Sequence, residues 1–452
     1  MTTPLLDGLS PVVDLDTGLR RLEQLVGPQT GLVGRVQQYP ANPGLPSFAI
    51  YAAELGDPGE ALPGVALSAR GRSIRGDMDG AGGGLDHDHA ALTAVAEALE
   101  RYASCTWSEE QFIWARAQEL GEDALDLHTV PRCSERELEH PRCPLVAPDP
   151  SAPIRWVRGV DLHNGRPRWV PAQLVYLHLP FLSRGERFTL PISTGCAAHT
   201  NLAAALRNAI CEVIERDALS LTWLQMLPLP RLELDRVPEE LAAVLDRCAD
   251  TDAQIHLFDA TTDLGVPTVY GLETATANSS VATVAMAATD LDPARAATKA
   301  IREAESCRMA LESRPQAGSQ DPDEFIGVFE GAAYMGAPER RSAFDFLLQG
   351  TETRALSELA VRTSGDPAEE LRWLLGQLQA SGMDAVAVDL TTDEAKRVGF
   401  RVVRVVVPQL QPLSFSYRAR FLAHPRLYSA PPAMGYRSRP ESDLNPWPQP
   451  FA

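Results

Sequence analysis

Apolar residues at helical spacing define one stretch of the chain most clearly. Between Asn208 and Asp217 there is no Gly or Pro, and Ile210, Val213 and Ile214 share one face of the predicted helix. The opposite face carries a polar stripe at positions i, i+4, i+7 and i+8, made of Asn208, Glu212, Glu215 and Arg216. The pattern predicts a helix with one apolar and one polar face.

The same stripe occurs earlier in the chain. Its members are Thr93, Glu97, Glu100 and Arg101, with Leu92, Val95, Leu99 and Tyr102 on the other side. Each striped helix follows a Gly-containing loop, and Asp86 or Asp88 is an N-cap candidate for the first. A third helix is predicted from Pro293 to about Glu312, with Lys299, Glu303 and Ser306 on one face.

The remaining pattern alternates between helices and strands. Helices are expected at 16–26, 239–248 and 367–381, and much of 320–365 is expected to be helical. Strands are expected at 46–53, 64–69, 154–160, 167–170, 253–258, 266–272, 280–287, 385–390 and 401–407. Asn164-Gly165 predicts a hairpin turn between two of these strands. The chain is therefore expected to contain both helices and strands.

No clear linker divides the sequence. The three helices with polar faces span more than 200 residues, which favours one intertwined catalytic unit. We therefore expect residues 1–60 to be an N-terminal segment of the same unit, and residues 61–452 to form the catalytic domain.

Composition excludes several classes of protein. The formal charge of -19 argues against a nucleic-acid partner, which would need a basic surface. The N-terminus lacks the pattern of a secretory signal, and no apolar stretch is long enough to span a membrane. Seven scattered cysteines without a CxxC motif are simplest as reduced thiols in a cytoplasm.

The polar stripes predict chemistry only if they meet. Two amphipathic surface helices with solvated faces are the alternative, and for either helix alone this is the expected case. Four carboxylates brought together would repel one another unless a cation neutralised them. Paired carboxylates suit Mg²⁺, which commonly also binds substrate phosphates. Our hypothesis is that the stripes face each other across a metal–nucleotide site.

The usual nucleotide-binding and hydrolase motifs are absent from the sequence. There is no GxxxxGK followed by Ser or Thr, no strand–helix GxGxxG and no GxSxG elbow. Gly82-Gly83-Gly84 fits either a backbone approach to phosphate or a flexible turn before a helix. His87 and His89 are expected to belong to a solvated helix cap rather than to a metal site. Cys133, Cys143, His128 and His140 match no standard zinc spacing.

The chain ends in an alternating proline segment containing Pro446, Pro448 and Pro450, two residues before the terminus. A polyproline segment is stiff and has little entropy left to lose on docking. It is either a disordered or partner-binding tail, or a rigid strap that enters the active site.

Together these motifs resemble the azoline-forming cyclodehydratase branch of the YcaO superfamily, over residues from about 60 to 452. The resemblance rests on the order of GAGGG before the first stripe, STGCAAH before the second, the helix with Lys299, Glu303 and Arg308, and the terminal PxPxP. It implies a YcaO-type α+β fold around a central ATP and Mg²⁺ site, with the Pro-rich tail entering that site.

The resemblance also implies roles for individual residues. The metal ligands would be Glu97, Glu100, Glu212 and Glu215. Nucleotide contacts would come from Arg72, Arg75, Thr93, Arg101, Asn208, Arg216, Glu303 and Arg308. The strap of Pro446, Pro448 and Pro450 would lie at the chemistry, with the terminal carboxylate of Ala452 as the base.

The sequence departs from the family pattern at two places. Many members carry Glu after the STGCAAH-like loop, where this chain reads Leu202-Ala203-Ala204-Ala205. Ser306 stands where Gln is common. The first departure removes one expected ligand and leaves the number of Mg²⁺ ions open.

The implied reaction is ATP-dependent cyclodehydration of Cys, Ser or Thr in a ribosomally made precursor peptide. The expected partners are that peptide and a homodimer partner, with either a separate leader-binding protein or direct recognition of the substrate; neither nucleic acid nor membrane is expected. Two alternatives remain: a thioamide- or amidine-forming enzyme with the same ATP site, and a non-catalytic precursor-binding subunit.

Overall fold

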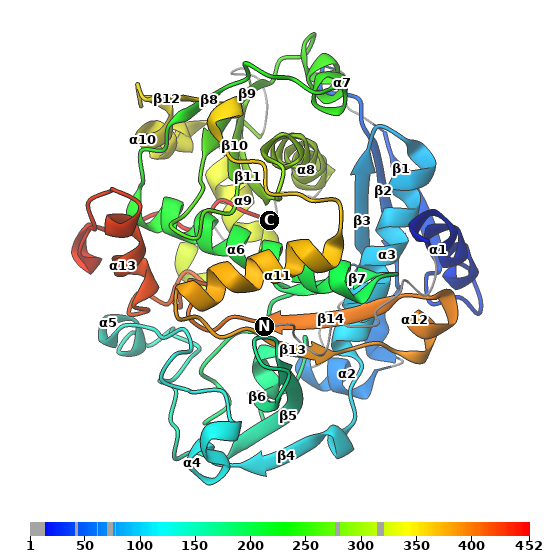
Figure 1. Ribbon diagram of the computed structural model, residues 1–452, viewed down its shortest axis with the longest axis vertical. Coiled ribbons are helices and arrows are strands. Elements are labelled where there is room, and N and C mark those ends of the chain that lie inside the picture. Colours follow the sequence, from blue (N-terminus) through cyan, green and yellow to red (C-terminus); the bar gives the residue numbers. More distant parts are fainter. Residues whose placement is uncertain are drawn as a thin grey trace.

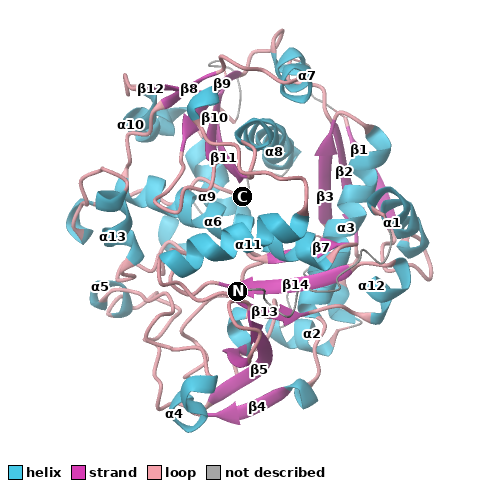
Figure 2. Cartoon of the chain, viewed as in Figure 1, coloured by secondary structure: helices cyan, strands magenta, loops and turns pink. Residues whose placement is uncertain are grey.

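The computed structural model describes residues 14–40, 44–60, 62–69, 76, 78–275, 281–313 and 321–452. All three expected polar-faced helices are present: α3 (His87–Cys105), α6 (Leu202–Gln225) and α8 (Pro293–Ser313) (Figures 1 and 2). Asp86 caps α3 by accepting a hydrogen bond from the His89 N–H at 2.7 Å. Asn201 caps α6 in the same way, accepting from the Ala204 N–H at 3.1 Å.

The described strands form three sheets. The first has the order β1-β2-β3, with β1 (Arg35–Tyr39), β2 (Ala49–Glu54) and β3 (Gly80–Gly84). The second has the order β11-β10-β9-β8-β12, with β8 (Arg231–Glu233), β9 (Gln254–Asp259), β10 (Thr268–Thr274), β11 (Thr283–Thr289) and β12 (Thr353–Ala355). The third has the order β4-β5-β13-β14-β7, with β6 paired to β5; its strands are β4 (Phe112–Ala115), β5 (Ile154–Asp161), β6 (Pro167–Pro171), β7 (Cys196–His199), β13 (Val386–Asp389) and β14 (Arg401–Val406).

Each of the three polar-faced helices packs against two different sheets. Helix α3 contacts β2 and β3 of the first sheet and β7 and β14 of the third. Helix α6 contacts β7 and β14 of the third sheet and β10 and β11 of the second, and α8 contacts β10 and β11 of the second sheet and β3 of the first. Each helix therefore lies between two of the three sheets, toward the middle of the molecule (Figure 1).

The other helices surround this arrangement. They are α1 (Leu15–Arg21), α2 (Pro63–Ala69), α4 (Ala117–Leu120), α5 (Glu135–Leu138), α7 (Glu239–Cys248), α9 (Val328–Gly336), α10 (Asp345–Leu348), α11 (Pro367–Ala380), α12 (Asp393–Val398) and α13 (Arg426–Ala433). Helix α11 packs along α6, and their contact buries Leu371, Leu374 and Leu378 with Ile210 and Ile214 (Figure 1). This contact brings the start of α11 close to the start of α6.

Several sequence predictions are confirmed. The strands β5 and β6 form the expected antiparallel hairpin, and Gly165 in its turn has a φ of +74°. Helix α7 has the predicted bounds, and α8 and α11 agree within a residue or two. The strand expected at 64–69 is wrong, because Pro63–Ala69 form helix α2. The short helix α12 between β13 and β14 was not predicted.

The glycine-rich stretch before α3 is a strand rather than a loop. A Cβ at Gly82 would lie 2.0 Å from the Ala90 carbonyl oxygen, and one at Gly80 would lie 2.1 Å from that of Ala94. A Cβ at Gly83 would point the other way, 2.6 Å from Ser306 Oγ on α8. The glycines therefore let β3 approach the backbone of α3 on one side and α8 on the other. Cys196–His199, expected in a loop, likewise form strand β7.

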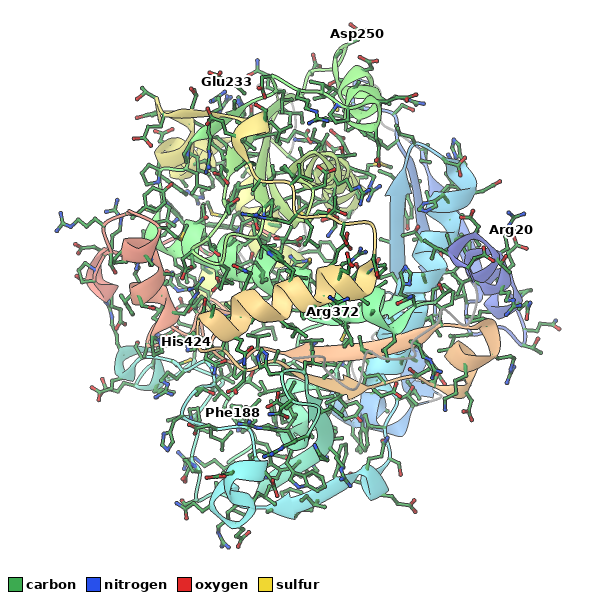
Figure 3. All side chains as sticks on the ribbon, in the orientation of Figure 1. Arg20, Phe188, Glu233, Asp250, Arg372 and His424 are labelled. Atoms are coloured by element: carbon green, nitrogen blue, oxygen red, sulfur yellow. The ribbon has the colours of Figure 1, made fainter. Side chains whose placement is uncertain are left out.

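Charged side chains of both signs lie at the periphery of the molecule. Charged residues such as Arg20, Glu233 and Asp250 are exposed at the rim of the molecule, whereas His424 is buried (Figure 3). In the part of the chain that the structure describes, no helix is long and apolar enough to cross a membrane. Arg72 and Arg75, expected to bind nucleotide, lie outside the described residues.

Candidate active site

The polar face of α3 is anchored to strand β3. Glu97 accepts a hydrogen bond from the Ala81 N–H at 2.8 Å through one carboxylate oxygen. Its other oxygen pairs with the Arg101 guanidinium at 2.6 Å, one helical turn further on. Both side chains keep about a third of their surface exposed, with 31% for Glu97 and 29% for Arg101. They are therefore ordered by the fold but still accessible to a ligand.

The polar face of α6 is anchored to the residue before strand β7 and to the last residue of strand β11. Glu212 accepts from the Gly195 N–H at 3.0 Å, and Glu215 accepts from the Thr289 N–H at 3.0 Å. Gly195 has a φ of +85°, and a Cβ there would lie 2.4 Å from the Val405 carbonyl oxygen, so only glycine fits this donor position. Arg216 lies 3.6 Å from Glu212 and 3.8 Å from Glu215.

Helix α8 adds a further cation to the same place. The Lys299 ammonium lies 3.4 Å from Glu215 on α6 and 3.6 Å from Glu303 on its own helix. Burial acts to lower the pKa of Lys299, but Glu215, Glu303 and Glu212 outweigh it and raise that pKa. The ammonium therefore stays charged in the folded protein and links α8 to α6.

Glu100 joins α3 to α6 electrostatically. Burial raises the pKa of Glu100 to about 8, and the nearby carboxylates of Glu212 and Glu97 add to the rise, against the effect of Arg101. Burial also raises the pKa of Glu212, partly offset by Arg216. Glu100 of the first stripe and Glu212 of the second are therefore near enough to influence each other, and Arg101 and Arg216 only partly balance their charges.

This donor set fits a magnesium ion carried by a nucleotide. Among the described residues no three His, Cys, Asp or Glu side chains converge as a complete metal site. Mg²⁺ does not need one, because it commonly takes one or two protein carboxylates and completes its shell with phosphate oxygens and water. Arg101, Arg216 and Lys299 are suitably charged to neutralise the remaining phosphate charge.

Of the other residues expected at the site, Thr93 and Asn208 lie on α3 and α6, whereas Arg308 faces elsewhere. Thr93 donates to the His89 carbonyl oxygen at 2.8 Å, within α3. Asn208 is exposed one turn before Glu212 on α6. Arg308 lies elsewhere: it is fully buried, and its guanidinium donates to Glu273 and to the Val281 carbonyl oxygen.

The proline-rich tail is docked on the protein along its length. The Tyr417 hydroxyl donates to the Pro446 carbonyl oxygen at 2.7 Å, and Asn445 N–H donates to Leu224 at the end of α6. Pro448 and Pro450 are buried, and Phe451 packs edge-on against Tyr270 with ring centres 5.7 Å apart. Ala452 is half-buried against a cluster formed by β11, α8 and α9, and the C-terminus lies near the middle of the view in Figure 1.

Two kinds of site residue escaped the sequence analysis. The backbone donors Ala81, Gly195 and Thr289 orient the carboxylates, but a backbone N–H leaves no signature in sequence. Glu370 on α11 binds Arg207 beside Asn208, and it is separated from α6 by more than 140 residues of chain. Only the folded arrangement identifies it.

Carboxylates and cations of three helices meet in one place in this α+β protein, a combination that suits metal-bound phosphates. A family model described as YcaO cyclodehydratase, ATP- and Mg²⁺-binding, matches residues 81–411. The chain belongs to the YcaO family, and its central domain binds ATP and Mg²⁺.

Two relatives are similar to this chain over about three quarters of its length. An uncharacterised protein in the tfuA 3′ region of Rhizobium leguminosarum bv. trifolii is 27% identical over 353 residues, covering 73% of this chain and 76% of the relative. An uncharacterised protein of Methanothermobacter thermautotrophicus is 26% identical over 338 residues, covering 74% and 82%.

Solved structures share the fold. A heterocyclase in complex with substrate and cofactor has a TM-score of 0.77 and 22% identity, and the heterocyclase TruD has 0.66 and 21%. These matches cover 96% and 98% of this chain, which spans only 57% and 56% of the two structures. YcaO from Methanopyrus kandleri bound with AMPPCP and Mg²⁺ has a TM-score of 0.62 and 19% identity, covering 88% of this chain and 91% of that one.

Proposed function

We propose that this chain is an ATP-dependent enzyme that cyclodehydrates Cys, Ser or Thr residues of a ribosomally made precursor peptide to azolines. The observation that carries the proposal is the convergence of Glu97 and Glu100 on α3 with Glu212 and Glu215 on α6. Buried like charges of this kind are costly unless a ligand cation binds between them. The similarity to heterocyclases supports azoline formation in particular.

In the proposed reaction the thiol or hydroxyl gives up its proton and its sulfur or oxygen attacks the preceding peptide carbonyl carbon. The resulting oxyanion takes the γ-phosphoryl group of ATP, and ADP leaves. Loss of the amide proton and of phosphate then closes the carbon–nitrogen double bond of the ring. Bound Mg²⁺ supplies neutralisation of the charge that moves onto the β- and γ-phosphates.

The residues of this chain have separate tasks in that reaction. Glu97, Glu100, Glu212 and Glu215 would each be available as a ligand, one or two of them to each Mg²⁺ ion, and Arg101, Arg216 and Lys299 would bind and orient the phosphates. Thr93, Asn208 and Glu303 border the nucleotide. The Ala452 carboxylate, held by the docked tail, accepts the proton of the attacking group.

The decisive experiment incubates the protein with ATP, Mg²⁺ and a Cys-containing precursor peptide, and follows peptide mass and ADP release. We expect one water lost and one ADP formed for each ring. Oxygen replaced by sulfur in the presence of sulfide, with no loss of water, would identify a thioamide-forming enzyme instead. ATP turnover that does not respond to the precursor would leave neither reaction standing.

Thioamidation is the second candidate because of one observation: a relative is encoded in the tfuA 3′ region, a setting that hints at thioamide formation. The same ATP site would then serve an external sulfur nucleophile. A non-catalytic precursor-binding role is disfavoured, because it gives the converging carboxylates no purpose.

A partner protein that presents the precursor is part of the proposal. A structure of similar fold is the E. coli microcin synthetase McbBCD complex with pro-MccB17 bound, with a TM-score of 0.55 and 15% identity. Full turnover by the isolated chain, unchanged by any added protein, would show that it recognises its peptide directly.

A further inference from the structure

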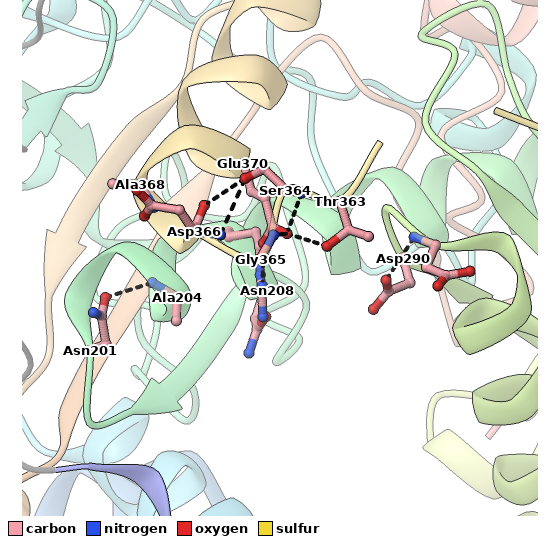
Figure 4. Close-up of polar contacts among 12 residues, drawn as sticks. Asn201, Ala204, Asn208, Asp290, Thr363, Ser364, Gly365, Asp366, Ala368 and Glu370 are labelled. Carbon is pink, nitrogen blue, oxygen red and sulfur yellow. Dashed lines mark hydrogen bonds and ion pairs between the residues drawn. The ribbon is translucent and has the colours of Figure 1, made fainter. Parts of the chain in front are cut away.

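A buried carboxylate at the start of α11, that of Glu370, accepts hydrogen bonds from the loop just before this helix and from Arg207 on α6. Glu370 is only 2% exposed. One of its oxygens accepts from the Thr363 hydroxyl and from the Ser364 and Gly365 N–H groups, both at 3.2 Å (Figure 4). The other accepts from Arg207 on α6 at 2.5 Å. With four donors, Glu370 is fixed in place.

Arg207, held by Glu370, in turn orients the side chain of Asn208, the next residue on α6. One arm of the guanidinium is held by Glu370, while Nε and Nη2 donate to Asn208 Oδ1 at 3.1 and 2.9 Å. A guanidinium only donates hydrogen bonds, so the amide oxygen of Asn208 must face Arg207. The amide NH₂ of Asn208 therefore points away from Arg207. The Asn208 side chain is exposed and lies one turn before Glu212 on α6.

We propose that Glu370 and Arg207 are positioning residues that fix the Asn208 amide so that its NH₂ donates to an acceptor atom of the bound nucleotide. This inference rests on the proposed place of Asn208 at the nucleotide. Without the pair, the amide is free to turn and presents oxygen as often as nitrogen. A Lys at position 207 could not replace the fork, because an ammonium is a point donor and cannot hold both partners in one plane.

The test is a double-mutant cycle on Mg–ATP affinity, measured by titration calorimetry on the full chain. Loss of one oriented hydrogen bond predicts about tenfold weaker binding for Arg207→Met and for Asn208→Ala. If Arg207 acts through Asn208, the double variant binds no more weakly than Asn208→Ala alone. Two independent, additive losses would overturn the inference, since a purely structural Arg207 would weaken binding whatever stood at 208.

A matched pair of variants covers the Glu370 end. Glu370→Gln should weaken Mg–ATP binding, whereas Glu369→Gln, on the exposed neighbouring position of α11, should leave it unchanged. Arg207→Lys keeps the charge and should weaken binding nearly as much as Arg207→Met; full affinity in Arg207→Lys would overturn the fork argument. If the wild-type protein binds no Mg–ATP, the proposed function itself is overturned. If the wild type binds Mg–ATP but the affinity losses of the two variants add, only the present inference is overturned.

Discussion

Glu100 on α3 and Glu212 on α6 face each other closely enough that the charge of Glu212 helps to raise the pKa of Glu100 to about 8, after the larger effect of burial. The fold thus holds two acidic groups together at a cost in stability. Such strain is typical of sites whose residues serve a ligand rather than the fold.

The first prediction concerns this pair. Glu212→Gln should lower precursor-dependent ADP release by about 100-fold or more, because a proposed metal ligand is lost. Thermal stability should be unchanged or higher, since a repulsive charge is also lost. Melting curves without ligand and a coupled ADP assay measure the two effects. Glu110→Gln, on an exposed position, is the control and should alter neither.

A second prediction uses the buried cluster of Glu273, Glu305 and Arg308. One guanidinium balances one carboxylate, so the second stays protonated: burial and then the charge of Glu273 raise the pKa of Glu305 to about 10. Between an ordinary pKa of 4.5 and this value the folded protein holds a proton that the unfolded chain has lost, so the free energy of unfolding falls as pH rises.

Replacing Glu305 with a neutral amide should remove that slope. The melting temperature of Glu305→Gln should gain on the wild type by about 2 °C or more between pH 6 and pH 9. Melting curves in a pH series provide the measurement, with the exposed Glu122→Gln as control. Parallel curves for Glu305→Gln and wild type would mean that Glu305 is ionised in the folded protein.

The third prediction separates the two roles of the tail. Deleting residues 446–452 would also expose the surface that Phe451 covers, and loss of a buried Phe costs about 3–5 kcal/mol, so lost activity would be ambiguous. Adding one Gly after Ala452 leaves the packing of Phe451 intact but moves the terminal carboxylate. Cyclisation should then fall by about 100-fold, a typical effect of losing a general base, while Mg–ATP affinity stays unchanged. Normal turnover in the extended chain would show that the tail only packs.

A fourth prediction follows from the glycine strand. Gly82→Ala places a Cβ against the Ala90 carbonyl oxygen of α3, and overpacking of this kind typically costs about 1–3 kcal/mol. Because Glu97 is held by the neighbouring Ala81, Mg–ATP affinity should fall as well. Gly376→Ala, on α11 with open space around it, is the control and should be neutral or stabilising. Denaturant unfolding and calorimetry report both quantities.

The helices of the site could be predicted from the sequence because their pattern is local. Ile210 and Ile214 on one face and Glu212 and Arg216 on the other require only the helical period. The hairpin at Asn164-Gly165 is local in the same sense. Strands β3 and β7 were missed because GAGGG and CAAH lack the β-branched residues that mark a strand; contact with α3, α6 and β14 decides their conformation instead.

The partners of the site residues are non-local and were therefore not predictable. Nothing in the sequence indicates that Thr289 orients Glu215, or that Glu370 binds Arg207. Arg308 was wrongly placed at the nucleotide site for a related reason. It lies on the same helix as Lys299 and Glu303, but the rotation of the helix turns it toward Glu273 and away from the other carboxylates.

Because α3, α6 and α8 are each shared between two sheets, no single sheet with its own helices can assemble the catalytic centre. A nascent or partly unfolded chain would contain only part of the proposed metal–nucleotide site. The proposed ATP-dependent activity should therefore appear only after all three helices have docked.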